Sequence, residues 1–115
     1  MSSNTEINMN FKADTGKSMY IKNQNIVKRE IHKEYYLIDI KQNYLSDKCY
    51  LYLLNAMGNY IWDLLDQYNS PMQISREIFG TVVGSINITD IYKDVTDFLN
   101  LLEKENFLEY IDEGN

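Results

Sequence analysis

The feature that most constrains the fold is a change in apolar periodicity at Leu53-Leu54-Asn55. Before it, over residues 34–54, apolar and aromatic residues alternate as in β-strands. After it, from Met57 onward, apolar residues recur every three or four positions, as on the buried face of an α-helix. A chain of 115 residues has room for one hydrophobic core. We therefore expect a single α+β domain in which a small N-terminal sheet leads into helices that cover it.

The strands are expected in the first half of the chain. Residues 20–22 and 26–27 predict one short strand, or a strand pair around an Asn-rich turn. Residues 34–40 and 49–54 predict two further strands, joined by a turn over residues 43–48. The expected sheet is therefore a small antiparallel one of about three strands.

Three α-helices are expected after the sheet, and each has a start signal. Asn55 can cap the first helix, which would run to about Gln67; Ser70-Pro71 begins the second, and Asn87 or Thr89 begins the third. The second helix should stop at Gly84 and the third near Asn106, and residues 107–111 could add a final turn or a short strand.

Apolar spacing predicts which side chains these elements bury. In the strand over residues 49–54, Leu51 and Leu53 should lie on the core side, opposite Tyr50, Tyr52 and Leu54. The helices should bury Met57, Ile61, Leu64, Leu65 and Tyr68, then Ile74, Ile78, Phe79 and Val82, then Ile91, Val95, Phe98, Leu99 and Leu102. Trp62 is expected as a core anchor.

Composition excludes several functional classes. Residues 1–18 are polar and predict a flexible arm, followed by the domain over residues 19–111 and a charged tail over 112–115. No apolar run is long enough for a membrane span or a signal peptide, so a cytoplasmic protein is expected. The single cysteine, Cys49, and the single histidine, His32, supply neither a disulfide nor a zinc site. Without a nucleophile–base pair or a glycine-rich phosphate loop, we expect no catalysis, no metal and no cofactor.

Charge is distributed unevenly along the chain. Residues 1–33 hold six Lys or Arg and three Asp or Glu, whereas residues 34–115 hold five and fourteen. An acidic domain repels phosphate backbones and favours basic or neutral polypeptides.

A set of short segments then points to a family. The segments are Leu53-Leu54-Asn55, Ile61-Trp62, Leu64-Leu65-Asp66, Ser70 followed by Ile74, and Asp94-Val95 with Phe98-Leu99 and Leu102. In this order and spacing, over roughly residues 27–111, they resemble the PqqD family, named for protein D of pyrroloquinoline quinone biosynthesis. The chain departs from that pattern at Gln67, where a glycine is usual, and at Ser46-Asp47-Lys48, which replaces a Pro-Glu-Arg-like turn.

The resemblance implies a winged helix-turn-helix fold and a binding function. Members are leader-peptide recognition elements for ribosomally made, post-translationally modified peptides. The resemblance therefore implies a non-catalytic peptide chaperone that presents the leader segment of a precursor peptide to a modifying enzyme, often a radical SAM enzyme. The leader is expected to add as a strand to the edge of the third strand, in a groove against the third helix.

The residues expected to contact the leader lie on those two elements. They are Cys49, Tyr50, Leu51, Tyr52, Leu53, Asp94, Asp97, Phe98, Leu101, Leu102 and Glu105. Tyr50 and Tyr52 are equally consistent with ordinary sheet-surface aromatics, and the acidic residues are consistent with a solvated helix face. Leu101 is the preferred candidate for lining a pocket. An exposed strand edge also permits homodimerisation as readily as peptide capture.

The alternative function is transcriptional, because winged helix-turn-helix domains commonly bind DNA through the third helix. Over residues 90–105 that helix carries two lysines and five acidic residues. A helix that faces phosphates needs the opposite balance. We therefore expect no nucleic-acid partner.

Overall fold

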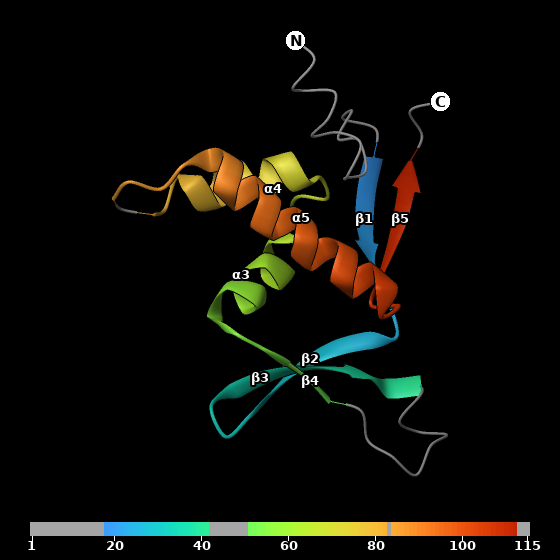
Figure 1. Cartoon of the computed structure of the whole chain (residues 1–115). Coiled ribbons are helices and arrows are strands. Elements are labelled where there is room, and N and C mark those ends of the chain that lie inside the picture. The colour runs from blue at the N-terminus through green and yellow to red at the C-terminus, as the bar shows by residue number, and fades with distance from the viewer. Residues whose placement is uncertain (1–17, 42–50, 83, 113–115) are drawn as a thin grey trace.

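The computed structural model describes residues 18–41, 51–82 and 84–112. Within these residues the chain forms two antiparallel sheets and three helices (Figure 1). In chain order the elements are β1 (Ser18–Lys22), β2 (Ile26–Ile31), β3 (Glu34–Asp39), β4 (Leu51–Leu54), α3 (Ala56–Leu64), α4 (Pro71–Phe79), α5 (Ile88–Lys104) and β5 (Leu108–Asp112). The α+β prediction, with a sheet before three helices in a winged helix-turn-helix arrangement, is confirmed.

The strands β2, β3 and β4 form a three-stranded meander in that order. Figure 1 shows this sheet below the helices, with α5 crossing above it. Leu37 of β3 and Leu54 of β4 point toward the helices and are buried. The opposite face of the sheet carries Leu51 and Leu53, which are 39% and 52% exposed. The prediction that Leu51 and Leu53 pack in the core is therefore wrong, because the helices cover only the other face of the pleat.

A second sheet joins the two ends of the described chain. β1 pairs antiparallel with β5, from Ser18 opposite Asp112 to Lys22 opposite Leu108. Residues 108–112 thus form a strand, which is one of the two alternatives predicted for residues 107–111. β1 and β2 flank the Asn-rich turn as expected but do not pair with each other, because each bonds to a different partner strand. Figure 1 shows β1 and β5 standing beside the C-terminal end of α5.

Side-chain caps start all three helices, at the predicted Asn55 and Ser70 and, for the third helix, at Asn87, one of its two predicted starts. The side-chain oxygens of Asn55, Ser70 and Asn87 accept hydrogen bonds from the main-chain N–H groups of Gly58, Gln73 and Thr89, respectively. The ends differ from the predictions for two helices: α3 ends at Leu64 and α4 at Phe79. Gly80 is the C-cap of α4, so it lies outside the helix interior. Asn106, after α5, adopts a positive φ of 67°, as expected for a helix end.

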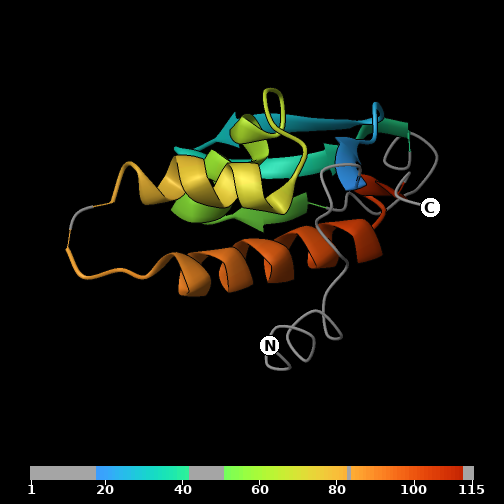
Figure 2. The ribbon, with the colours of Figure 1, turned by 90° about the horizontal axis from the view of Figure 1, so that it is seen from above.

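The core lies between the three-stranded sheet and the helices. Figure 2 shows α4 and α5 running side by side in opposite directions, and together with α3 they bury one stripe each. Trp62, predicted as an anchor, is buried, and the Lys22 ammonium lies 4.5 Å from its ring centroid. Met57 and Phe79 were expected in the core but are exposed, because they lie at the first and last turns of their helices, beyond the region where other elements cover them.

Candidate functional site

The free edge of β4 is the first component of the candidate site. β4 pairs with β3 on one side, and within the described residues no strand pairs with its other edge. An unpaired edge presents a row of main-chain donors and acceptors that another chain can use.

The hairpin between β2 and β3 determines which main-chain groups point to that edge. It turns through His32 and Lys33, both with positive φ (53° and 68°), as in a two-residue hairpin loop. The flanking residues, Ile31 and Glu34, are therefore a hydrogen-bonded pair, and such pairs recur at every second position. The 3.0 Å hydrogen bond from the N–H of Ile40 to the carbonyl oxygen of Asn25 fits this alternation.

It follows that the odd-numbered residues of β3 bond to β4. Their partners on β4 are Leu54, opposite Tyr35, and Tyr52, opposite Leu37. The main-chain groups of Tyr52 and Leu54 are thus used inside the sheet, whereas those of Leu51 and Leu53 point to the free edge.

A stripe of α5 is the second component, and we call it the α5 stripe. It consists of Asp94, Phe98 and Leu101 together with the C-cap residue Glu105, and their spacing of four, three and four places them along one side of the helix and its end. A Cβ atom built on Gly58 of α3 would lie 3.0 Å from Cζ of Phe98, so this end of the stripe touches α3. At the other end, the Glu105 carboxylate lies close enough to Tyr52 of β4 to interact with it electrostatically. Burial raises the pKa of the Tyr52 hydroxyl, and the negative charge of Glu105 raises that pKa further.

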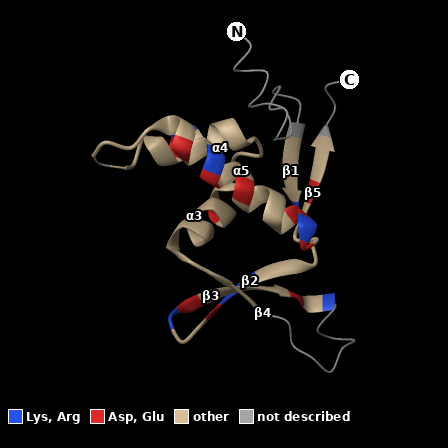
Figure 3. Cartoon of the chain, in the orientation of Figure 1, with Lys and Arg blue, Asp and Glu red and all other residues tan. Residues whose placement is uncertain are grey.

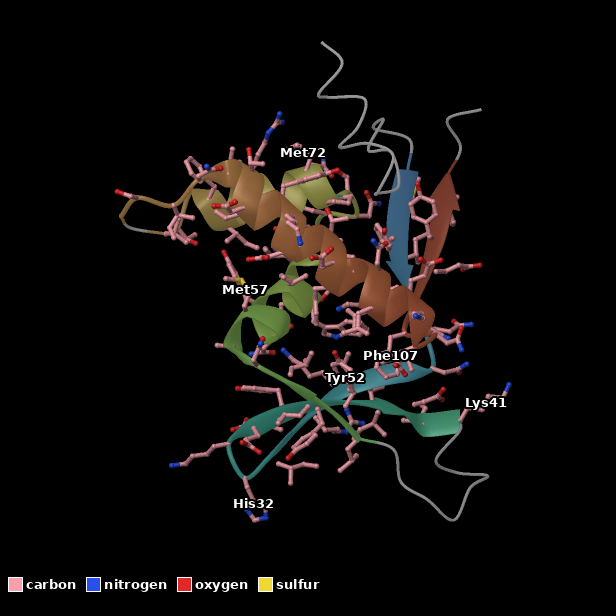
Figure 4. All side chains as sticks on the ribbon, in the orientation of Figure 1. His32, Lys41, Tyr52, Met57, Met72 and Phe107 are labelled. Carbon is pink, nitrogen blue, oxygen red and sulfur yellow. The ribbon has the colours of Figure 1, made fainter. Side chains whose placement is uncertain are left out.

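Tyr52 lies on the helix side of β4 rather than on an open sheet surface. It is half-buried, and its ring packs edge-on against Phe107 with 5.4 Å between the centroids. Figure 4 shows the two rings between the sheet and the C-terminal end of α5. Tyr52 therefore forms the wall of the region between β4 and α5, next to the free edge.

A pocket of about 300 Å³ extends the site beyond the end of β4. It opens between α3, α4 and α5, and Figure 4 shows Met57 projecting from α3 toward α5 beside it. The lining residues are Asn55, Met57, Gly58, Ile61, Ile78, Ile91, Asp94, Val95 and Phe98. Asn55 directly follows β4, so the strand edge and the pocket are consecutive along the chain.

The structure places seven of the eleven predicted residues on β4 or the α5 stripe, and of those on β4 only Tyr52 has its side chain on the helix side. Leu51, Tyr52 and Leu53 lie on β4, and the α5 stripe supplies four more; Cys49 and Tyr50 lie outside the described residues, as does the predicted turn over residues 43–48. Leu102 is completely buried, so its side chain is not available to contact a peptide, contrary to the prediction. Asp97 lies further round the helix, where it pairs with Lys93 at 2.9 Å.

Met57 and Gly58 are the site residues that sequence reasoning missed. Periodicity assigned Met57 to the core, although it is 46% exposed beside the pocket. The sequence signal that could have identified this site is Gly58 itself. A glycine inside a helix lowers helix stability by about 1 kcal/mol relative to alanine, so its presence often indicates that another element approaches closely.

That close approach gives a testable difference between two glycines. Gly80→Ala should stabilise the protein by about 0.4–1 kcal/mol, because its φ of −70° suits alanine and an added Cβ meets nothing nearer than 3.6 Å. Gly58→Ala should bring no such gain, because its Cβ would contact the Phe98 ring at 3.0 Å. Urea unfolding followed by the fluorescence of Trp62, the single tryptophan, measures both values. Equal stabilisation by the two substitutions would contradict the close contact between α3 and α5.

The exposed side of α5 is acidic. Figure 3 shows several acidic positions along this helix, and Ile88–Lys104 contains Asp90, Asp94, Asp97 and Glu103 against Lys93 and Lys104. Such a surface disfavours DNA phosphates. Among the described residues there is no group of three potential His, Cys, Asp or Glu metal ligands, and no helix there is both long and apolar enough to cross a membrane.

Comparisons with known proteins agree with this arrangement. Residues 46–108 match the family model for coenzyme PQQ synthesis protein D, PqqD. Among solved structures, the chain is similar to TbiB1 in complex with the TbiA(beta) leader peptide, with a TM-score of 0.62 and 24% sequence identity. That match covers 83% of this chain and 96% of the other, and at this identity it establishes the fold. No curated protein sequence matches the chain.

Proposed function

The chain belongs to the PqqD family, and from this premise we propose that it is a leader-peptide recognition element. Its ligand would be the leader segment of a ribosomally made precursor peptide. The similar fold of TbiB1, which was solved with a leader peptide, supports the same class of ligand.

The observation that carries the proposal is the free edge of β4. A leader in extended conformation would add as a further strand and exchange main-chain hydrogen bonds with Leu51 and Leu53, whose N–H and C=O groups point to that edge. These bonds would supply affinity and register with little dependence on the leader sequence.

Side-chain selectivity would come from the helix side of the added strand. Residues of the leader that point toward α5 would meet Tyr52 and the α5 stripe. The stripe combines apolar contact at Phe98 and Leu101, the latter 41% exposed, with carboxylates at both ends. The proposed peptide-binding residues are therefore Leu51, Tyr52, Leu53, Asp94, Phe98, Leu101 and Glu105.

Binding without chemistry is the proposed role. The modification would be carried out by a partner enzyme, for which a radical SAM enzyme is our expectation, and the recognition element would hold the precursor peptide for it.

Leu53→Pro tests the strand-addition geometry. Proline removes the outward N–H and places its ring at the edge, where a paired strand would lie, so affinity for a leader should fall by about tenfold or more. The domain should still fold, because proline is tolerated where a strand's N–H faces solvent. Fluorescence anisotropy with the labelled leader of a precursor peptide encoded beside the gene measures the change, and circular dichroism checks the fold.

Two comparisons make the result specific. Leu53→Ala removes the same side chain but keeps the N–H, so it separates the side-chain contribution from the main-chain one. A gel shift on duplex DNA should show no tight, salt-sensitive binding. Unchanged leader affinity in a folded Leu53→Pro protein would rule out capture at this edge.

A further inference from the structure

The pocket beyond β4 has an apolar interior with one carboxylate among its lining. The side chains of Ile61, Ile78, Ile91 and Val95 at its floor are buried in the core. Met57 and Phe98 form its sides, and a methionine side chain is flexible enough to close over different occupants. Filling such a cavity with an aliphatic or aromatic side chain favours binding, because it removes apolar surface from water.

Asp94 distinguishes this pocket from an ordinary gap between helices. Three other exposed carboxylates, on or just after α3 and on α5, are neutralised within the protein: Asp63 by Lys28 at 2.7 Å, Asp66 by Lys22 at 2.8 Å and Asp97 by Lys93 at 2.9 Å. In the described part of the chain, Asp94 has no such close ion pair; its charge acts only weakly on the neighbouring Lys93, whose main partner is Asp97, and Asp94 is exposed at the pocket. A cation brought by a ligand would therefore meet a carboxylate that is not already paired.

The pocket also lies where an added strand would continue. Asn55 and Met57 line it, and they follow the last residue of β4, Leu54, by one and three positions. A peptide paired along β4 and extending past Leu54 would therefore reach this opening.

We infer that this pocket receives one apolar side chain of the precursor peptide and that Asp94 binds a Lys or Arg next to it in the peptide sequence. This inference rests on the proposed function, since it assumes a peptide strand at the β4 edge. It adds the chemical class of the recognised motif: an aliphatic or aromatic anchor with a basic residue one or two positions away.

Selection from a phage-displayed library of random dodecapeptides tests this motif without knowledge of the natural precursor. Peptides enriched on the wild-type protein should share an apolar residue followed or preceded closely by Lys or Arg. On Asp94→Lys the apolar residue should persist, while the basic residue should be replaced by Asp or Glu. Asp97→Lys is the matched control: it changes an acidic residue on the same helix that is not part of the pocket lining, and selection should remain as on the wild type.

A synthetic version of an enriched peptide gives the quantitative test. Replacing its basic residue by Glu should weaken binding to the wild type by about fivefold and strengthen binding to Asp94→Lys by a similar factor. Replacing its apolar anchor by Ala should weaken binding to both proteins. In methyl NMR spectra, the Met57 methyl resonance should shift with the anchored peptide and not with the Ala version.

The outcomes separate this inference from the proposed function. If the peptides selected on the wild type show no preference for Lys or Arg, or if Asp94→Lys selects the same peptides, the role of Asp94 is overturned. If those peptides no longer bind to Leu53→Pro, the proposed function still stands. If peptides with the predicted motif bind equally well to Leu53→Pro, the pocket acts without strand addition, and the proposed capture at the β4 edge is ruled out. A wild-type protein that selects no peptide would overturn both.

Discussion

Replacing Leu54 by Ala is expected to lower the free energy of unfolding by about 2–5 kcal/mol, whereas Leu53→Ala should change it by less than about 1 kcal/mol. The two leucines are adjacent in β4, but Leu54 is 6% exposed and Leu53 is 52% exposed. Removing a buried leucine loses its transfer free energy and leaves a cavity, while removing an exposed one costs mainly strand propensity.

Urea denaturation followed by Trp62 fluorescence measures both changes on the same scale. The pair is a test of register, because a shift of one residue would exchange the two faces of β4. Similar losses for both variants, or the larger loss for Leu53→Ala, would mean that β4 presents its other face to the helices.

Replacing Trp62 by Ala is expected to cost about 3–5 kcal/mol, a large part of the 5–15 kcal/mol typical of a domain. Trp62 of α3 is 3% exposed. The substitution also removes the ring that the Lys22 ammonium of β1 approaches. Thermal unfolding monitored by far-UV circular dichroism is the suitable measurement, since this variant lacks the fluorescent probe.

Met57→Ala is the matched comparison on the same helix. Met57 is exposed at the pocket, so its removal should leave the melting temperature nearly unchanged while weakening the capture of a peptide anchored there. A melting temperature lowered as much as by Trp62→Ala would assign Met57 to the core and remove it from the site.

The sequence of α5 predicted part of the surface that is proposed to contact a peptide. A helix with Asp94, Phe98, Leu101 and Glu105 along one face and a buried stripe beside it follows from spacing alone. Leu102 is buried, although Leu101 lies only about 100° from it on the helix, and only the packing of α4 and β5 against α5 determines where the buried face ends.

What the sequence determined by itself is the local structure. The helix starts at Asn55 and Ser70 were predictable, and the third was narrowed to Asn87 or Thr89, because a cap is a hydrogen bond between residues two or three positions apart. The alternation of side chains along β4 and the excess of acidic over basic residues in α5 also follow from the local sequence alone.

Only the tertiary structure decided which faces those elements turn inward. Alternation divides β4 into two faces but does not say which one the helices cover, so Leu51 and Leu53 were assigned to the wrong side. The pairing of β1 with β5 and the pocket between α3, α4 and α5 likewise depend on contacts between segments far apart in the chain. Such contacts depend on the shapes of both partners, and neither segment's own sequence specifies the other.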